Sequence, residues 1–172
     1  MDTQQLTAVK GDEGFEYKVS VIHMRTRMKY SEIHPQATTK VCAEVLERAR
    51  NVLPPFYIVF TDNAMIFTMK YTAHKDRKTA FTKKADELGI IHALVPKGKP
   101  WRNGFIERSN RTDNEDFFRK IQFKSSEERK MLFRLWEAEY NCSRPHQSLN
   151  MKTPLETFKN DYNIHAHLRN TS

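Results

Sequence analysis

The sequence predicts a domain of the α/β class with a mixed sheet, and three stretches carry the prediction. Residues 16–22 alternate apolar and polar side chains, as a half-buried strand does. Residues 38–53 carry a single apolar stripe at helical spacing. Residues 56–60 (Phe-Tyr-Ile-Val-Phe) form an unbroken apolar run, which is typical of a strand buried on both faces. Strands, a crossover helix and a buried strand in this order indicate a sheet covered by helices.

The elements before the crossover helix are expected to form an antiparallel meander. Residues 2–9 can form a short first strand, and residues 11–14 (Gly-Asp-Glu-Gly) form a turn before the second strand. Residues 28–33 then give a third strand, which Pro35 stops. Thr38 or Thr39 can cap the helix that follows.

Three further elements are expected after the buried strand. Residues 68–78 have neither a helical nor a strand period, so we expect an exposed loop. Residues 79–88 predict a helix that ends at a glycine, and residues 90–95 a short strand. A basic loop at residues 96–102 leads to a helix from Asn103 to about Phe118.

The last third of the chain is expected to be helical. Residues 125–128 (Ser-Ser-Glu-Glu) form a capping box that opens a helix to about Tyr140. We expect four apolar side chains of this helix to point inward: Met131, Leu132, Leu135 and Trp136. Thr153-Pro154 starts a last helix. We therefore expect residues 1–120 to form the core and residues 121–172 a C-terminal helical extension of the same domain.

Composition narrows the class of protein. The 172 residues suit a single domain, and no apolar run approaches the roughly 20 residues that span a membrane. The first thirty residues lack the apolar region of a signal peptide. The two cysteines, Cys42 and Cys142, are 100 positions apart, which excludes a disulfide scaffold and suits the cytoplasm.

The charge balance favours a polyanionic partner. The formal net charge is +8, which indicates either nucleic acid or an acidic membrane surface. The cations are concentrated between residues 97 and 111, where a single acid, Glu107, stands among five of them: Lys97, Lys99, Arg102, Arg108 and Arg111.

Two carboxylates stand at places where chemistry could occur. Asp62 closes the buried strand, where a carboxylate must be solvated, hydrogen-bonded or bound to a metal; an Asx turn is the structural alternative. Glu107 lies in the first turns of the helix after the basic loop. It could meet an aspartate at the end of a neighbouring strand, or it could simply favour the helix dipole.

The order of these features resembles the catalytic core of DDE transposases and retroviral-type integrases, and within that family the insertion-sequence branch. The resemblance spans roughly residues 2 to 158. It rests on Asp2-Thr3, residues 21–27, Thr61-Asp62-Asn63 with Phe67, residues 89–92, residues 100–112 (Pro-Trp-Arg-Asn-Gly-Phe-Ile-Glu-Arg-Ser-Asn-Arg-Thr), Tyr140-Asn141, residues 144–149 (Arg-Pro-His-Gln-Ser-Leu) and Lys152-Thr153-Pro154.

This resemblance implies a ribonuclease-H-like fold, with a five-stranded mixed sheet flanked by helices. It implies that Asp2, Asp62 and Glu107 are the catalytic carboxylates and hold two Mg²⁺ (or Mn²⁺) ions. The implied chemistry is hydrolysis of a DNA phosphodiester, followed by strand transfer that joins a 3′ end to target DNA. Lys97, Lys99, Arg102, Arg108 and Arg111 would contact phosphates.

The resemblance also implies the partners: the ends of a mobile element, target DNA, and further copies of the chain in a homodimer or higher assembly. Such a protein would be cytoplasmic and associated with the nucleoid when bound to DNA. His92 and His146 match family positions, where we expect a structural or DNA-backbone role. His165 and His167 have no cysteine partners nearby, so we expect tail residues and no zinc module.

Departures from the family keep a second function open. Ala64 stands where the family usually has glycine, and would be strained if the turn needs a positive φ. Asp2 is the second residue, so we expect almost no strand before it, and the usual end-binding helix-turn-helix does not precede it. The alternative is a catalytically inactive, nucleic-acid-binding remnant of a decayed mobile element. A ribonuclease-H-type nuclease fits the late signature less well.

Overall fold

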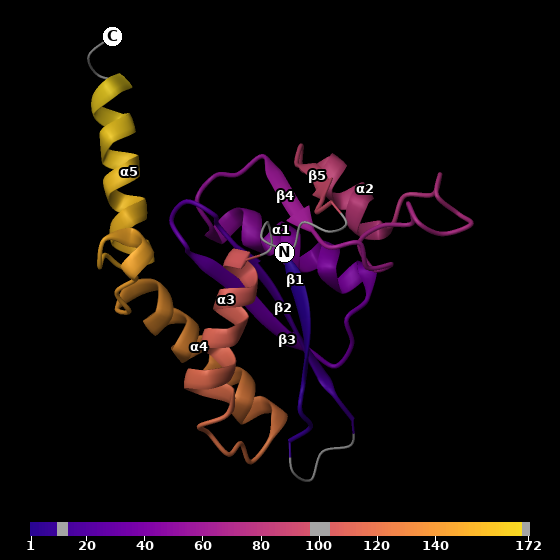
Figure 1. The fold of residues 1–172 in the computed structure, drawn as a ribbon, viewed down its shortest axis with the longest axis horizontal. Helices are drawn as coiled ribbons and strands as arrows, with labels where there is room; N and C mark the ends of the chain where they lie inside the picture. Colours follow the sequence, from indigo (N-terminus) through magenta and orange to yellow (C-terminus); the bar gives the residue numbers. More distant parts are fainter. Residues whose placement is uncertain (10–13, 97–103, 170–172) are drawn as a thin grey trace.

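The structure, a computed structural model, describes residues 1–9, 14–96 and 104–169, with side chains up to residue 161. Figure 1 shows a sheet with helices around it and a last helix that extends away from the sheet. The elements are β1 (Asp2–Leu6), β2 (Glu16–Ile22), β3 (Lys29–His34), α1 (Thr39–Val52), β4 (Ile58–Thr61), α2 (Ala80–Glu87), β5 (Ile91–Leu94), α3 (Gly104–Asp113), the π-helical turn η2 (Asn114–Phe118), α4 (Ser126–Cys142), the short 3-10 helix η3 (Gln147–Leu149) and α5 (Pro154–Arg169).

The strands form two ladders that lie side by side. β1, β2 and β3 form the expected antiparallel meander, with Asp2 opposite Ser20. β4 and β5 pair in parallel. The backbone nitrogen of Met1 donates a hydrogen bond of 2.6 Å to the carbonyl of Phe60, and this bond links the start of β1 to β4. The expected five strands are therefore present, in two ladders that this bond joins.

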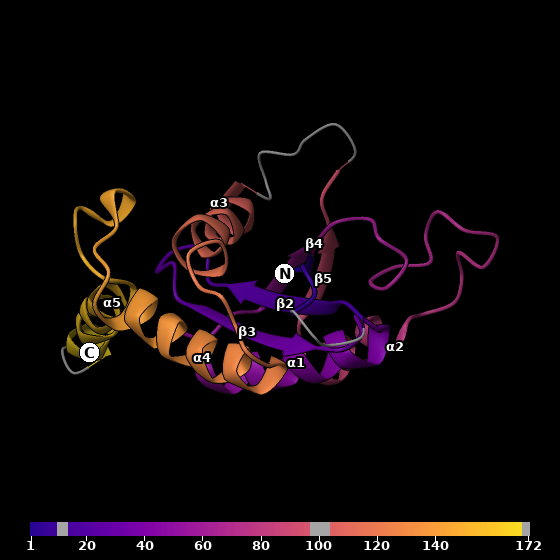
Figure 2. The same ribbon diagram turned by 90° about the horizontal axis from the view of Figure 1, so that it is seen from below.

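Helix α1 covers one face of the meander. Thr38 caps it, accepting a hydrogen bond from the backbone nitrogen of Val41. Its predicted stripe, which includes Cys42, Val45 and Leu46, packs against the side chains of β2 that point toward it. Figure 2 shows α3 on one side of β2 and β3 and α1 on the other. The two faces of the meander are thus both covered, as the α/β prediction requires.

The face opposite α1 carries the second core and an unusual buried polar layer. Phe117 of η2 and Phe133 of α4 pack with Leu6 and Ile33. Between them and the sheet, Lys18 and Lys29 are fully buried. Alternation in a strand places Lys18 on the face that would be solvent-exposed in a two-layer protein. Here α3, η2 and α4 cover that face, so the lysines are enclosed.

The strand around residues 56–60 differs from its prediction. β4 begins only at Ile58, and the side chains of Tyr57 and Ile58 are 67% and 48% exposed. The expectation of a strand buried on both faces was therefore wrong for its first half. These residues line a cavity of about 370 Å³ between β4 and β2, and only Val59 belongs to the buried core.

Helix α4 packs differently from the expected arrangement. In α4, the capping box is confirmed, since Ser125 Oγ accepts from the backbone nitrogen of Glu128. Leu132 and Trp136 pack against the second core as expected. However, Met131 and Leu135 are exposed, whereas Arg129, Phe133 and Tyr140 are buried. Arg129 is buried on this helix because it forms an ion pair with Glu16 of β2. The pattern of apolar residues in the sequence does not predict a buried arginine.

Other expectations hold within the described ranges. Residues 68–78 form turns and no regular element, and Thr79 caps α2. Cys42 is buried and Cys142 is exposed, and both are free. No described helix is both long and apolar enough to cross a membrane.

Candidate active site

Asp2 stands at the start of β1, on the sheet face that α3 covers. Asn110 of α3 donates a hydrogen bond of 2.7 Å from Nδ2 to Asp2 Oδ2. Burial raises the pKa of Asp2 above its ordinary value, and the nearby charge of Asp62 adds to this, while hydrogen bonds from Thr3 and Asn110 oppose it. Asp2 is therefore held rigidly, and its ionised form would gain from a bound cation.

Asp62 follows the last residue of β4. Its Oδ1 accepts a hydrogen bond of 3.0 Å from the backbone nitrogen of Ala64, so the Asx turn expected as the structural alternative is present. Ala64 is not among the three non-glycine residues with positive φ in the described ranges, which are Arg27, Asn150 and Met151. The alanine is therefore unstrained, and the turn leaves Asp62 close enough to Asp2 to affect its pKa.

Glu107 lies in the first turn of α3 and is exposed. It lines a cavity of about 420 Å³ together with Asp2, and Asn110 and Arg111 lie on the same side of the helix, as their spacing predicted. Phe105 was expected to face the core but is exposed, whereas Ile106 is buried as expected.

The structure brings the three predicted carboxylates together only in pairs. Asp2 is near Asp62, and Asp2 shares a cavity with Glu107. Asp62 does not line that cavity. Within the described ranges, no three His, Cys, Asp or Glu side chains lie close enough to hold a metal ion. The donors present are carboxylate oxygens, which match the preference of Mg²⁺, but the set is not closed.

Two of the five predicted cations, Arg108 and Arg111, are among the described residues, and they line different cavities. Arg111 lines the carboxylate cavity, and Arg119, which the sequence did not single out, lies there as well. Arg108 is exposed and lines a separate cavity on another side of α3. Lys97, Lys99 and Arg102 lie outside the described residues, as does Trp101.

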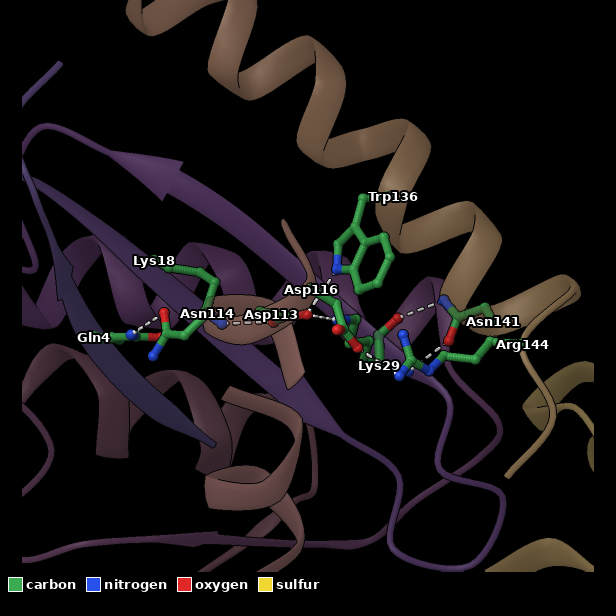
Figure 3. A network of polar contacts seen from close by, with 9 residues as sticks. All are labelled: Gln4, Lys18, Lys29, Asp113, Asn114, Asp116, Trp136, Asn141 and Arg144. Atoms are coloured by element: carbon green, nitrogen blue, oxygen red, sulfur yellow. Dashed lines mark hydrogen bonds and ion pairs between the residues drawn. The ribbon is translucent and has the colours of Figure 1, made fainter. Parts of the chain in front are cut away.

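A buried polar network anchors α3 and η2 to the sheet (Figure 3). Asp113, the last residue of α3, binds Lys18 of β2 and Lys29 of β3 through separate oxygens, and Trp136 Nε1 of α4 donates to it at 2.8 Å. Burial alone would raise the pKa of Asp113, but the charges of Lys29 and Lys18 outweigh it and hold the pKa below its ordinary value.

Two further contacts reinforce this anchor. Gln4 Nε2 of β1 donates a hydrogen bond of 2.7 Å to Oδ1 of Asn114, the first residue of η2. Arg144 pairs with Asp116 of η2 at 2.6 Å. Because Gln4 and Asp2 belong to one strand and Asn114 follows α3, this set of contacts fixes the helix that carries Glu107 relative to the strand that carries Asp2.

Two parts of the family signature have structural roles. Asn141 pairs with β3 through two hydrogen bonds, accepting from the backbone nitrogen of Lys29 and donating to its carbonyl, so it fastens the end of α4 to the sheet. His92 of β5 lies 2.8 Å from Thr61 Oγ1 and packs edge-on against Phe81. Burial lowers the pKa of His92, and the expected structural role fits these contacts.

Comparison with known proteins agrees with this arrangement. A family model described as an integrase core domain matches residues 88–154, which include β5, α3 and α4. The catalytic core domain of BIV integrase superposes with a TM-score of 0.66 at 16% identity, covering 96% of each chain. The HTLV-2 integrase catalytic core domain, solved in complex with magnesium in a trimeric form, gives 0.66 at 11% identity, covering 91% of this chain and 93% of that one.

These likenesses show the fold: it is that of integrase catalytic cores, which is ribonuclease-H-like. The resemblance to integrase catalytic cores drawn from the sequence is confirmed. Among curated proteins, the ORF3 product of Spiroplasma virus SpV1-C74, provisionally named an integrase, is 23% identical over 146 residues. That match covers 80% of this chain but only 40% of the viral protein.

Proposed function

We propose that the chain is the catalytic core of a DNA transposase or integrase, performing metal-dependent phosphodiester hydrolysis and strand transfer. The observation that supports this most is the placement of Asp2 and Glu107 on one cavity, with Asp62 close enough to raise the pKa of Asp2. Asp2 at the start of β1 and Glu107 of α3 line this cavity, and Asp62 follows β4 outside its lining.

Asp2, Asp62 and Glu107 would hold the metal. Two bound Mg²⁺ or Mn²⁺ ions would activate a water or a 3′-hydroxyl and stabilise the leaving oxygen. Asn110 orients the Asp2 carboxylate, and the Asx turn fixes Asp62. Glu107 would complete the set from the first turn of α3. Arg111 and Arg119 would attract the phosphate backbone to the same cavity.

Partners follow from the same proposal. DNA would be the substrate, as element end and as target, and Lys97, Lys99, Arg102, Arg108 and Arg111 would contact its phosphates. The similar structures include a simian T-cell lymphotropic virus intasome, covering 91% of this chain and 53% of that one at 15% identity with a TM-score of 0.67. We propose that this chain also acts as a dimer or larger assembly on DNA.

The test is nicking and strand transfer on duplex DNA with Mg²⁺ or Mn²⁺. We expect activity in the unmodified chain, and loss of at least 100-fold (on the order of the term that transition-state charge stabilisation supplies) in Asp2→Asn, Asp62→Asn and Glu107→Gln. Asp76→Asn serves as the control, because it removes one carboxylate from the exposed loop at residues 68–78. Equal activity in all five proteins would contradict the catalytic assignment.

The second candidate, a non-catalytic DNA-binding remnant, is favoured by one observation: the three carboxylates do not form a closed metal-ligand group in the described structure. It predicts DNA binding without metal-dependent cleavage. Isothermal titration calorimetry with Mn²⁺ distinguishes the catalytic core from the non-catalytic remnant. The catalytic core should bind Mn²⁺ in a manner that Asp62→Asn abolishes, whereas the remnant should show no such site.

A further inference from the structure

A second cavity of about 450 Å³ lies on another side of α3, among α3, the turn between β2 and β3, and the segment that follows α4. Three arginines line it: Arg27 from the turn, Arg108 from α3 and Arg144 after α4. Of its described lining residues, none is acidic. We call it the arginine cavity. It is distinct from the carboxylate cavity, with which it shares no lining residue.

Arg27 is stacked on an aromatic ring, and one of its nitrogens has no hydrogen-bond partner among the described residues. Its guanidinium carbon lies 3.6 Å from the centroid of the Phe105 ring. Its Nη1 is buried without a hydrogen-bond partner in the described structure. Burial lowers the pKa of Arg27, and the charge of Arg108 lowers it further. A desolvated donor of this kind is costly unless it binds an anion.

Arg27 also has a backbone that few residues of its type adopt. Its φ is 62°, in the left-handed region, and the turn is fixed by two hydrogen bonds of 2.8 Å between residues 23 and 27 and between residues 23 and 28. A left-handed conformation is strained for a non-glycine residue. The turn holds the guanidinium over Phe105 and toward the cavity in spite of that strain.

The other walls add donors that are equally fixed. Arg144 is held by Asp116 at 2.6 Å, and its guanidinium carbon lies 5.5 Å from the Trp136 ring. His146, two residues later, packs edge-on against Tyr140, and its Nε2 is buried without a hydrogen-bond partner among the described residues. The Arg-Pro-His-Gln-Ser part of the late signature thus forms one wall of this cavity.

We propose that the arginine cavity binds a phosphate group of the DNA backbone. Guanidinium groups match phosphate by paired N–H donors. Arg27 and Arg108 have no ion pair among the described residues, and Arg144, which Asp116 holds in place, stands beside them in a lining that contains no acidic residue. The choice of DNA as the source of the phosphate rests on the proposed function. α3 stands between the two cavities and is about 10–12 Å across. The phosphate bound here would therefore be a different one from the reacting phosphate.

The test compares variants that each remove one positive charge. In Arg27→Asn, asparagine tolerates the left-handed backbone; in Arg134→Gln, the control, the lost arginine is exposed on α4 and lies outside both cavities. Binding of a fluorescent duplex is measured by anisotropy from 50 to 200 mM salt. One lost phosphate contact reduces the slope of log affinity against log salt by about 0.9. Between 50 and 200 mM salt, such a variant should therefore lose about 3.5-fold less affinity than the unmodified chain loses.

We expect this reduction in Arg27→Asn and a larger one in Arg27→Asn/Arg108→Gln, with Arg134→Gln unchanged. Equal slopes for Arg27→Asn and Arg134→Gln would overturn the proposal. This readout does not need cleavage, so a chain that binds DNA with the expected slopes but does not cut it would contradict the proposed function and leave this site supported.

A second measurement uses the unmodified chain, in case Arg27→Asn does not fold. Phenylglyoxal modification of arginines is followed by peptide mass spectrometry, with duplex DNA, with inorganic phosphate, or with neither. We expect duplex DNA to slow the modification of Arg27 and Arg108 but not of Arg134. Protection by inorganic phosphate alone would assign the site to a free anion and overturn DNA as its occupant. Absence of protection in both would overturn the site.

Discussion

Lys18 Nζ lies 2.6 Å from Asp113 Oδ2, and both side chains are buried. Lys29 binds the other oxygen of the same carboxylate. A single buried carboxylate therefore serves two buried ammonium groups at the end of α3. Such a group is weak evidence for stability, because desolvation of three charges offsets their attraction. It favours one position of α3 on the sheet, because a shift that breaks either ion pair would leave a buried charge unpaired.

The first prediction concerns this group. Asp113→Ala leaves two buried ammonium groups without a counter-ion and should lower the free energy of unfolding by about 3–5 kcal/mol. Urea denaturation followed by circular dichroism measures it. Asp86→Ala, which breaks the exposed pair with Lys78, should cost under about 1 kcal/mol. The triple variant Lys18→Met/Lys29→Met/Asp113→Leu should recover most of the loss. A triple variant as unstable as Asp113→Ala would contradict the charge explanation.

The second prediction concerns Glu137, on α4 near the same group. Burial raises its pKa to about 7, although the charge of Lys29 opposes this. The folded state therefore holds the proton more tightly than the unfolded state. The resulting stability is complete below about pH 4.5, the ordinary pKa, and is lost as the pH rises through about 7.

Glu137→Gln should remove this loss and be more stable than the unmodified chain above pH 7, by up to about 3 kcal/mol. Urea midpoints at pH 5, 6, 7 and 8 provide the measurement. Glu139→Gln, an exposed neighbour on the same helix, should follow the unmodified chain at every pH. If Glu137→Gln also follows it, the buried carboxyl does not titrate in this range.

The third prediction separates burial from residue type. Phe117 is 3% exposed and contacts the rings of Phe118, Phe123, Phe133 and Trp136, whereas Phe15 is 57% exposed. Phe117→Ala should lower the free energy of unfolding by about 3–5 kcal/mol. Phe15→Ala should change it by less than about 0.5 kcal/mol. Thermal unfolding of both proteins tests this, and similar losses would show that η2 does not anchor the second core.

Local periodicity predicted most of the fold. The second strand was predicted at residues 16–22, where β2 lies, and α1 begins one residue after its predicted cap. The same periodicity could not show which sheet face would be covered. Lys18 alternates with Val19 as a solvent-facing residue does, and only the tertiary placement of α3, η2 and α4 makes it a buried partner of Asp113.

The candidate site could be predicted only in part. The order of elements and the family signature pointed to Asp2 and Glu107, which the fold does bring to one cavity. Asp62 forms the Asx turn that was its structural alternative, and its charge also raises the pKa of Asp2, while its role as a metal ligand stays a prediction. Arg27 was outside the predicted basic segment. Arg27 adopts a left-handed backbone, and an arginine in a sequence does not predict that conformation.

The ten residues of α3 place side chains in three different surroundings. Glu107 lines the cavity that Asp2 also lines, Arg108 lines the arginine cavity, and Asp113 pairs with Lys18 of the sheet. One inserted or deleted residue between Glu107 and Asp113 would turn one end by about 100° relative to the other. No such change could preserve all three contacts. The loop at residues 68–78 is free to gain or lose length over evolutionary time, but the spacing within α3 is not. Length variation in related chains should therefore spare this helix.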